Sequence, residues 1–279
     1  MSDENLAEIR NEKAKKIQHP KGKLTAYERL NLLLDEGSFS EIDQHVASDE
    51  NPEGEAVITG TGTIHGRPVF VFSEDFSVMG GSLGEVVAKK ILKIMDHALE
   101  ARAPIIGIKD SGGARIQEGI SSLFGYAQIF KKNVEASGKV PQISVVVGPS
   151  AGGAVYSPAL TDFIFQVKDI GQLYVTGPAV VKTVTGEDVT FEELGGVEAH
   201  GTKSGVTHQV CETEEQAFEE IRYLMSFLPQ SSSQKPPMFI TEDEPSRVID
   251  SLDSFIPENR NQPYDMEKII LDIVDDGEH

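Results

Sequence analysis

A short apolar run followed by a Gly-Gly pair occurs three times between residues 70 and 155, and this repeat constrains the fold more than any other feature. FSEDFSVMGGS, IIGIKDSGGARI and ISVVVGPSAGGA each join a strand-like run to a segment predicted to be helical. Strands that alternate with helices form parallel sheets, in which the carboxyl ends of the strands meet at one edge. The sequence therefore predicts an α/β protein with its glycine turns at that edge, where ligands of such sheets bind.

The rest of the chain is predicted from its apolar spacing and its breakers. Residues 1–36 contain two helical patterns, and AVITGTGTIHGRPVFVF predicts two strands joined by a tight turn at His65-Gly66. In the third repeat unit we expect one helix from the glycine turn to Val167. EQAFEEIRYLMSF predicts a further helix, and SSSQKPP predicts a linker. We expect a helical segment at 1–36, a main domain at 37–230 and a linker with an acidic tail at 231–279.

Composition excludes several classes of protein. The chain has 279 residues, of which 39% are hydrophobic and 25% charged, as expected of a folded protein with a sizeable core. The formal net charge of −20 argues against a nucleic-acid partner, because phosphate binding needs a positive surface. From Cys211 to His279 the chain has 17 Asp and Glu against 5 Lys and Arg, a surface that aids solubility or steers a basic partner.

The cysteine content and the apolar runs of the sequence bear on disulfide bonds and on cellular location. The chain has one cysteine, Cys211, which excludes an internal disulfide and a four-cysteine zinc site. There is no run of 18 apolar residues, and MSDENLAEIRNEKAKK lacks the apolar stretch of a secretory signal. We expect a cytoplasmic protein without direct membrane contact, or one in a matrix-like compartment if a leader has been removed.

Glycine turns of this kind predict chemistry carried by the backbone. A Gly-Gly pair that follows a buried strand and opens a helix exposes N–H groups at the positive end of the helix dipole. Such groups bind anions or stabilise a developing oxyanion, and tight packing is the competing interpretation. The sequence lacks GxxxxGK[ST], GxSxG and HExxH, and no histidine lies between His97 and His200. An enzyme built this way leaves proton chemistry to the substrate or a cofactor.

DSGGARIQEG and GPSAGGAVYSPALTDFIF resemble the biotin-dependent acyl-CoA carboxyltransferases. Within that family the likeness is nearest to the N-terminal half of propionyl-CoA carboxylase β subunits. It extends over KLTAYERLNLLLDEGSF, FSEDFSVMGGSLGE and VTGPAVVKTVTGEDVTFEELGG, and so covers nearly the whole chain. The resemblance implies a crotonase-like ββα spiral preceded by N-terminal helices.

The resemblance also implies roles for the residues of the three turns. The expected catalytic residues line an oxyanion hole and its opposite wall, and they are Gly152, Gly153, Gly112 and Gly113. The expected CoA-binding residues are Gly80, Gly81, Ala114 and Arg115. For Arg115 we expect a phosphate-binding or positioning role, with a surface salt bridge as the alternative. No metal site is expected in this chain, because His65, His97, His200 and His208 have no metal-ligand spacing.

The reaction that the resemblance implies is transfer of the carboxyl group from carboxybiotin to the α-carbon of propionyl-CoA or acetyl-CoA, through an enolate. Biotin is then carried on a partner, a biotin carboxyl carrier protein or biotin carboxylase subunit. Family subunits have two crotonase-like halves, and this chain ends near the close of the first, so we expect a second carboxyltransferase half as a partner. Homo-oligomers are expected as well.

Three alternatives stay open at this point. The chain is alternatively the carboxyltransferase subunit of a methylmalonyl-CoA or glutaconyl-CoA decarboxylase, which runs the transfer in reverse. A second alternative is a non-catalytic acyl-CoA-binding or assembly module. A self-sufficient hydratase of the crotonase type is disfavoured, because Glu118 has no partner glutamate to activate water with it.

Overall fold

A computed structural model describes residues 3–244 and 246–277 of the chain. It divides into two compact units, Met1–Pro236 and Pro237–His279. The first unit contains the N-terminal helices and the sheet, and the second contains the acidic tail. The domain boundaries that the sequence predicts at residues 36 and 230 stay predictions.

The described part of the first unit is organised on one mixed sheet of eight strands, in the order β1-β2-β3-β4-β5-β6-β8 with β7 paired to β5. β1, β2 and β3 are antiparallel neighbours, and β3, β4, β5, β6 and β8 are parallel. The strands are β1 (Ser40–Ile42), β2 (Val57–Ile64), β3 (Arg67–Glu74), β4 (Ile105–Ser111), β5 (Gln142–Ala151), β6 (Phe163–Val167), β7 (Gln172–Tyr174) and β8 (Gln209–Cys211).

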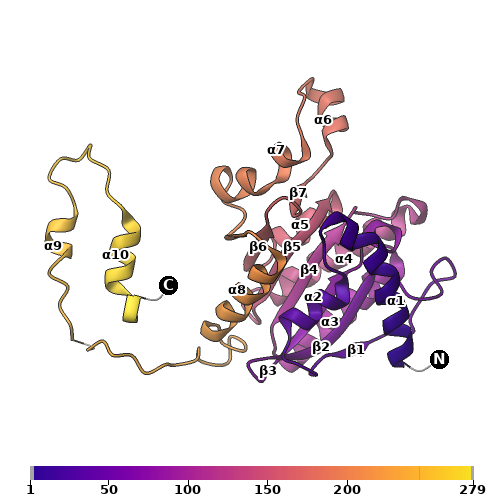
Figure 1. Ribbon diagram of the computed structural model, residues 1–279, viewed down its shortest axis with the longest axis horizontal. Helices are drawn as coiled ribbons and strands as arrows, with labels where there is room; N and C mark the ends of the chain where they lie inside the picture. The colour runs from indigo at the N-terminus through magenta and orange to yellow at the C-terminus, as the bar shows by residue number, and fades with distance from the viewer. Residues whose placement is uncertain (1–2, 245, 278–279) are drawn as a thin grey trace. The chain divides into compact units, whose positions relative to one another are not determined.

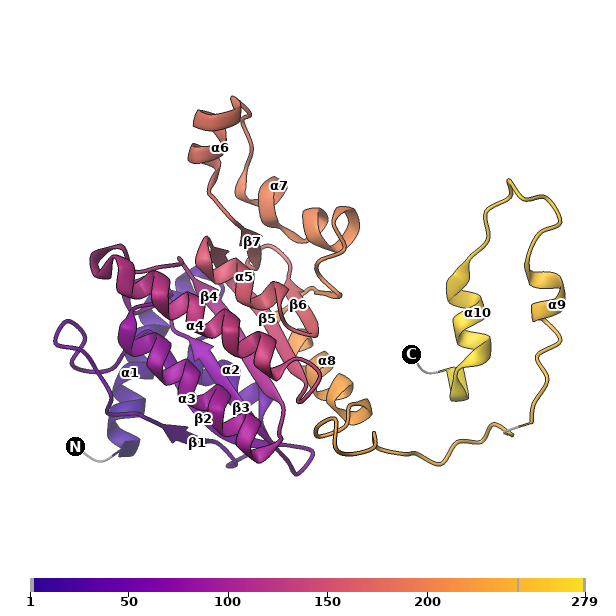
Figure 2. The ribbon, with the colours of Figure 1, turned by 180° about the vertical axis from the view of Figure 1, so that it is seen from behind.

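Helices cover both faces of this sheet. Figure 1 shows α2 and α8 in front of the strands, and Figure 2, seen from behind, shows α3 and α4 across the opposite face. The helices of this unit are α1 (Asp3–Gln18), α2 (Ala26–Leu33), α3 (Glu85–Ala101), α4 (Ile120–Ala136), α5 (Gly153–Ala159), α6 (Pro178–Thr185), α7 (Phe191–Gly195) and α8 (Glu214–Phe227). Short turns of helix are η1 (His19–Lys21), η2 (Met79–Gly81), η3 (Ile116–Glu118) and the π-helical η4 (Glu198–Lys203).

Two apolar cores hold these layers together. Leu30 and Leu33 of α2 pack with Phe218 of α8 against one face of the sheet, and all three are buried. On the other face, Ile91 of α3 and Ile129 of α4 pack against strand residues in a second core. Each such side chain stabilises the fold by about 2 kcal/mol when it is fully buried. The helical spacing of these residues in the sequence follows from this one-sided burial.

The third repeat unit differs from its prediction. A single helix from the glycine turn to Val167 was expected, but α5 ends at Ala159 and residues Phe163–Val167 form the parallel strand β6. Pro158 lies in the last turn of α5, and FIFQV consists largely of aromatic and β-branched residues that suit a strand. The expectation was wrong because this apolar run is too short to be assigned by periodicity alone.

The predicted hairpin turn at His65-Gly66 is confirmed, because β2 and β3 are antiparallel and both turn residues have positive φ. Asp35 caps this turn. Its carboxylate accepts hydrogen bonds from the amides of Gly66 (2.8 Å) and His65 (3.1 Å), and from Thr63 Oγ1 (2.7 Å) and Arg222 (2.9 Å). Burial opposes ionisation, yet the bonds from Gly66, Thr63 and Arg222 hold the pKa of Asp35 well below its usual range.

Replacement of Asp35 with Asn is expected to lower the free energy of unfolding by about 1 to 2 kcal/mol at pH 7. The asparagine side chain would place an NH₂ group, which cannot accept hydrogen bonds, against some of these donors. A carboxyl whose pKa is lowered by folding stabilises the protein above its unfolded pKa of about 4 and loses that contribution as pH falls toward the folded value. Urea unfolding from pH 7 to pH 3 should therefore show the two proteins converging. A difference that stays constant with pH would contradict this origin.

The second unit carries two short helices, α9 (Leu252–Phe255) and α10 (Met266–Ile273), followed by η5 (Asp275–Gly277). The predicted mixture of short helices and turns is confirmed for the described tail. Arg247 donates to the carbonyl oxygens of Asp272 and Ile273 at the end of α10. Across the described residues of both units, no helix combines the length and apolar composition that a bilayer crossing requires.

Candidate active site

The three glycine turns lie at the carboxyl ends of β3, β4 and β5, and backbone hydrogen bonds join the first turn to the second. The Gly112 amide donates to the Gly80 carbonyl (2.8 Å), and the Leu83 amide donates to the Gly113 carbonyl (2.9 Å). The Arg115 amide then donates to the Leu83 carbonyl (2.9 Å), which makes a short parallel bridge. The structure thus brings together the residues that the sequence placed on one edge.

Close approach explains two of the glycines. A Cβ at Gly81 would lie 2.1 Å from the Asp110 carbonyl oxygen, and a Cβ at Gly113 would lie 2.7 Å from the Ala151 carbonyl oxygen. Both residues also have positive φ, at 66° and 103°. The first turn therefore packs against the second, and the second against the third. Tight packing, the competing interpretation of the glycine pairs, is correct for these two residues.

The turns differ in how they lead into helices. Gly152 is the residue before α5, as predicted, but α3 begins at Glu85 and α4 at Ile120, well after the other two glycine pairs. The prediction that each pair opens a helix is therefore wrong for Gly80-Gly81 and Gly112-Gly113. The intervening residues form the bridge between the turns and the short helix η3.

Hydrogen bonding decides which amides remain free for a ligand. The Gly152 amide donates to the Tyr174 carbonyl (3.1 Å), and the Gly113 amide donates to Ser111 Oγ (3.1 Å). Among the described residues, no acceptor takes a hydrogen bond from the amide of Ala114 or of Gly153. Gly153 is the first residue of α5, where amides have no acceptor within the helix. The amides of Ala114 and Gly153 therefore provide one donor each on the adjacent second and third turns.

Arg115 is buried beneath these turns. Its guanidinium donates to Glu55 (2.8 Å), Glu118 (2.9 Å) and the Ser82 carbonyl (3.2 Å), and 1% of the residue is exposed. Burial alone would lower its pKa, but the two carboxylates raise it above the usual value. The side chain ties the second turn to the start of α3, an arrangement that favours the positioning role over phosphate contact. The salt bridge that was the alternative exists, but it is not on the surface.

A second set of buried charges, missed in the sequence, lies behind the second turn. The carboxylate of Asp110 accepts hydrogen bonds from Lys23 (2.7 Å), Arg29 (2.9 Å) and Gln18 (3.0 Å). Arg29 also pairs with Glu214 (2.5 Å) at the start of α8. These bonds attach the N-terminal helices to β4 directly before the glycine turn. Charged residues inside the apolar run IIGIKDS are the signal that could have revealed them.

On the opposite face of the sheet, Lys109 and Glu74 form a buried pair at 3.4 Å. Burial lowers the pKa of Lys109 and raises that of Glu74, and each partner's charge opposes that shift. Glu74 also accepts a hydrogen bond from the Asp110 amide (2.9 Å), and the Lys109 ammonium lies 4.3 Å from the centre of the Phe72 ring. The strand ends that carry the first two turns are therefore joined by side chains as well as by backbone.

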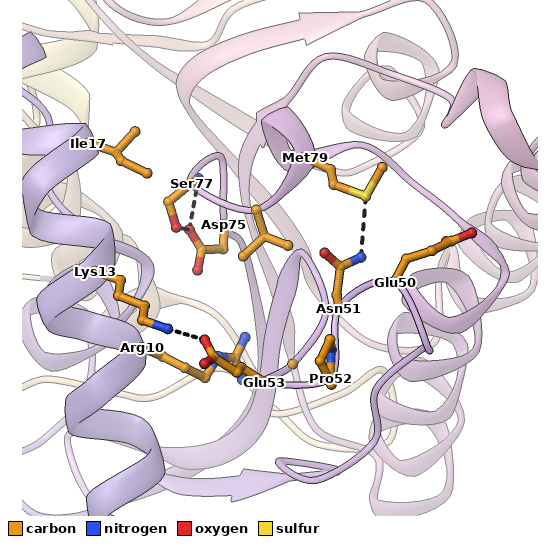
Figure 3. A pocket seen from close by; sticks show the side chains of 12 residues that line it. Arg10, Lys13, Ile17, Glu50, Asn51, Pro52, Glu53, Asp75, Ser77 and Met79 are labelled. Carbon is orange, nitrogen blue, oxygen red and sulfur yellow. Dashed lines mark hydrogen bonds and ion pairs between the residues drawn. The ribbon is translucent and has the colours of Figure 1, made fainter.

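A pocket of about 370 Å³ lies beside the first turn (Figure 3). Met79, next to Gly80, forms one wall with Asn51, and Ser77 and Asp75 form another. The pocket is lined by Arg10, Lys13, Ile17, Glu50, Asn51, Pro52, Glu53, Gly54, Asp75, Ser77, Val78 and Met79. It mixes both signs of charge with apolar surface, which suits an organic ligand better than a simple ion.

The remaining titratable candidates are engaged elsewhere. His200 contacts the Leu173 carbonyl (2.7 Å) and Ser204 (2.9 Å), and His65 contacts the Arg222 carbonyl (2.9 Å). Burial raises the pKa of Cys211 to about 12, so its thiol is unreactive. Within residues 3–244 and 246–277, no three histidine, cysteine, aspartate or glutamate side chains gather as metal ligands do.

Comparison with known proteins agrees with this geometry. Residues 17–279 match the carboxyl transferase domain. The chain belongs to the carboxyl transferase domain family. A propionyl-CoA carboxylase beta chain from Roseobacter denitrificans is 54% identical over an alignment of 269 positions, which covers 94% of this chain and 53% of that protein. A methylmalonyl-CoA decarboxylase subunit alpha from Veillonella parvula is 52% identical over an alignment of 287 positions, which covers 99% of this chain and 56% of that protein.

The solved structure of transcarboxylase 12S, described as a hexamer assembly with methylmalonyl-coenzyme A and methylmalonic acid bound, matches this carboxyl transferase domain with a TM-score of 0.90. It is 44% identical, and the match covers 99% of this chain and 56% of that one. The predicted crotonase-like α/β fold with N-terminal helices is confirmed. The chain spans about half the length of the relatives it matches.

Proposed function

We propose that this chain is the N-terminal carboxyltransferase half of a biotin-dependent acyl-CoA carboxylase acting on propionyl-CoA or acetyl-CoA. The observation that carries the proposal is the pair of unoccupied amide donors, Ala114 and Gly153, on adjacent turns of a carboxyl transferase domain. These turns lie at the sheet edge where parallel α/β proteins bind ligands.

The two amides suit the chemistry of carboxyl transfer. Removal of the α-proton from an acyl-CoA places negative charge on the thioester oxygen, and preorganised N–H donors stabilise that oxygen in the resulting enolate. Each such donor typically contributes about 3 kcal/mol to the transition state. We assign this role to the Gly153 amide, with the Ala114 amide opposite it. Gly112, Gly113 and Gly152 hold the turns in place, because their own amides are bonded within the protein.

The turns also leave room for a planar cofactor head. A Cβ at Gly112 or Gly152 would be in ordinary van der Waals contact with its nearest neighbour, at 3.4 Å or 3.8 Å, so neither residue is closed off by tight packing. This cradle fits biotin carried on a partner protein, and Gly112 and Gly152 would border it. Carboxybiotin supplies the carboxyl group and, after its loss, a basic ureido group. The chain contributes orientation and amide donors, consistent with the histidines being engaged elsewhere.

We place the CoA portion along the first turn. Gly80 is followed by Gly81, and the pocket that Met79 lines lies beside these two residues. Arg10 and Lys13 from α1 line that pocket and bring positive charge toward it. Lys13 is paired with Glu53 at an exposed position, where exchange for a ligand phosphate costs little. Arg115 supports the second turn from below, through Glu55 and Glu118.

An apolar patch next to the site supports the proposed partner, a second carboxyltransferase half. We define this η3–α4 patch as Ile116, Ile120, Leu123 and Phe124, whose exposed fractions are 88%, 82%, 61% and 63%. It borders a groove of about 470 Å³ between α3 and α4. Contiguous exposed apolar surface marks an interaction site. Relatives contain about as many residues again as this chain, enough for such a partner domain.

Substitution of Phe124 by Lys is expected to weaken association with a separately produced C-terminal half of a propionyl-CoA carboxylase beta chain at least tenfold, since an interface anchor typically contributes about 2 kcal/mol. The melting temperature should not change, because Phe124 is already 63% exposed. Association can be measured by analytical ultracentrifugation. Val134→Lys, at a 65% exposed position further along α4, is the control and should bind normally. Equal loss in both variants would contradict the assignment.

A carboxyltransferase that runs toward decarboxylation remains the second candidate, because the methylmalonyl-CoA decarboxylase subunit is similar over nearly the whole chain. The backbone amides would serve carboxylation and decarboxylation alike.

A hydratase is disfavoured further, since Glu118 is bound by Arg115 and by the Glu85 amide (2.6 Å). The cytoplasmic location, the biotin carrier partner and the homo-oligomer stay predictions, the last supported by the hexamer described for transcarboxylase 12S.

Calorimetric titration with propionyl-CoA and acetyl-CoA tests the proposal. Micromolar binding, followed by biotin-dependent conversion of methylmalonyl-CoA to propionyl-CoA when the second half is added, would support it. Binding without transfer under those conditions would identify the chain as an assembly module. If neither binding nor transfer occurs with the second half present, the proposed function is wrong.

A further inference from the structure

Buried polar side chains join the helix that follows the third glycine turn to the strand that precedes it. The Asn133 side-chain amide, on α4, donates to Gln142 Oε1 (3.0 Å), and the Gln142 side chain donates back to the Asn133 carbonyl (3.1 Å). Ser157 of α5 donates from its hydroxyl to Asn133 Oδ1 (3.1 Å). Each of the three residues is at most 3% exposed. Asn133 therefore links β5 to α5 with both the oxygen and the nitrogen of its side chain.

Helix α5 has few bonds of its own to hold it in place. It contains seven residues, and Pro158 in its last turn has no backbone N–H to donate within the helix. Helices this short are marginal in isolation, so packing and side-chain bonds decide where they lie. Helix α5 packs beside α4 (Figure 2), and Ser157 is one helical turn beyond Gly153. A bond that holds Ser157 therefore also holds the Gly153 amide.

The start of β5 holds the segment just beyond α5 as well. The Gln142 amide donates to the Asp162 carboxylate (2.9 Å), and the Asp162 amide donates to the Gln142 carbonyl (2.9 Å). Gln142 opens the strand that ends in the third turn, and α5 leads from that turn toward Asp162. Strand, turn and helix are thus closed into one loop, and Asn133 braces that loop along α5.

We propose that Asn133 is a positioning residue of the carboxyl-transfer site, which holds α5 and the Gly153 amide through Ser157. This role rests on the proposed function, in which the Gly153 amide stabilises the thioester oxygen of the enolate. A donor that moves away from that oxygen stabilises the transition state less. The CoA portion, placed along the first turn, is bound as before. Loss of the Asn133–Ser157 bond should therefore slow transfer more than it weakens binding.

Hydrogen exchange of the full chain, read by mass spectrometry, tests the Asn133–Ser157 bond without any substrate. Ser157→Ala removes the hydroxyl and leaves the bonds between Asn133 and Gln142 in place. Alanine favours a helix more than serine does, so helix propensity alone predicts slower exchange in α5. Loss of the bond predicts the opposite, exchange about threefold or more faster over residues 152–161. Unchanged or slower exchange there would overturn the proposal.

Two further variants separate this bond from general destabilisation. Asn133→Ala removes the acceptor of Ser157, so adding Ser157→Ala to it should accelerate exchange over 152–161 no further, whereas additive acceleration would contradict the bond. The matched control is Thr59→Val on β2, which removes a buried hydroxyl that donates to the Ile42 carbonyl (2.8 Å) and should leave that exchange unchanged. If Asn133→Ala does not fold, the comparison of Ser157→Ala with Thr59→Val decides the proposal.

Steady-state kinetics with the second half present measures the effect on transfer. Ser157→Ala should lower kcat about threefold to tenfold, with KM for propionyl-CoA unchanged within about twofold, and Thr59→Val should match the wild type. Faster exchange in Ser157→Ala at a wild-type kcat would show a purely structural bond and overturn the positioning role. If the wild type neither binds nor transfers, the proposed function fails, and the exchange data alone decide whether Asn133 holds α5.

Discussion

Gly153→Val is expected to lower the rate of carboxyl transfer about 100- to 1,000-fold, the loss typical of removing one oxyanion donor. A valine Cβ would lie 2.6 Å from the Tyr126 ring, which is itself buried and stacked on Phe130. The turn must then move outward and carry the Gly153 amide away from the thioester oxygen. Single-turnover kinetics with the second half present, together with calorimetric titration of propionyl-CoA, measure the effect.

The matched control is Gly138→Asn. Gly138 follows α4 with φ at 70°, and no atom lies within 4 Å of a Cβ placed there. Asparagine tolerates this backbone conformation, so transfer and binding should match the wild type. Transfer by Gly153→Val at more than a tenth of the wild-type rate would remove Gly153 from the oxyanion hole. The Ala114 amide would then have to act with another donor.

Arg29→Met is expected to lower the free energy of unfolding by about 3 to 5 kcal/mol, the usual cost of removing one partner from a buried ion pair. The guanidinium is completely buried and bridges Asp110 (2.9 Å) and Glu214 (2.5 Å). Methionine fills much of the same volume but leaves both carboxylates in a dry environment with fewer donors. Because Asp110 directly precedes the second glycine turn, acyl-CoA binding should weaken as well.

Urea unfolding at pH 7 measures this loss. Lys168→Met breaks the Lys168–Glu212 pair, whose side chains are 45% and 69% exposed, and serves as the control. Exposed pairs contribute little, so its unfolding midpoint should equal that of the wild type. If Arg29→Met proves no more destabilising than Lys168→Met, the network does not hold the N-terminal helices to β4.

Residue patterns that act over short separations were assigned correctly from the sequence. The hairpin at His65-Gly66 follows from two apolar runs and a turn that tolerates positive φ. The glycine turns after β3, β4 and β5 follow from buried strands that end in small residues. The run FIFQV could not be assigned, because five residues, four of them apolar, suit either a strand or a buried helix, and the parallel partner β5 decides between them.

The chemistry of the site could likewise be predicted only in part from the sequence. The sequence indicated that backbone amides at Gly112, Gly113, Gly152 and Gly153 would matter, since only small residues leave amides accessible. It could not indicate that three of these amides are already bonded, to Gly80, Ser111 and Tyr174, because those acceptors depend on how the turns pack. The same packing leaves the Ala114 amide without an acceptor among the described residues, which makes it a candidate donor.

By itself, the sequence determined the alternation of strands and helices, the position of the glycine turns at one sheet edge and the family to which the chain belongs. These properties depend on periodicity and on residue size, which are local. Only the tertiary structure decided which amides are free and that Arg115 is buried. It also decided that Asp110 meets Arg29 across 81 residues of chain and that Tyr126 contacts Gly153. Hydrogen bonds and charge pairs between distant segments depend on ångström-scale distances, which arise only when the layers pack.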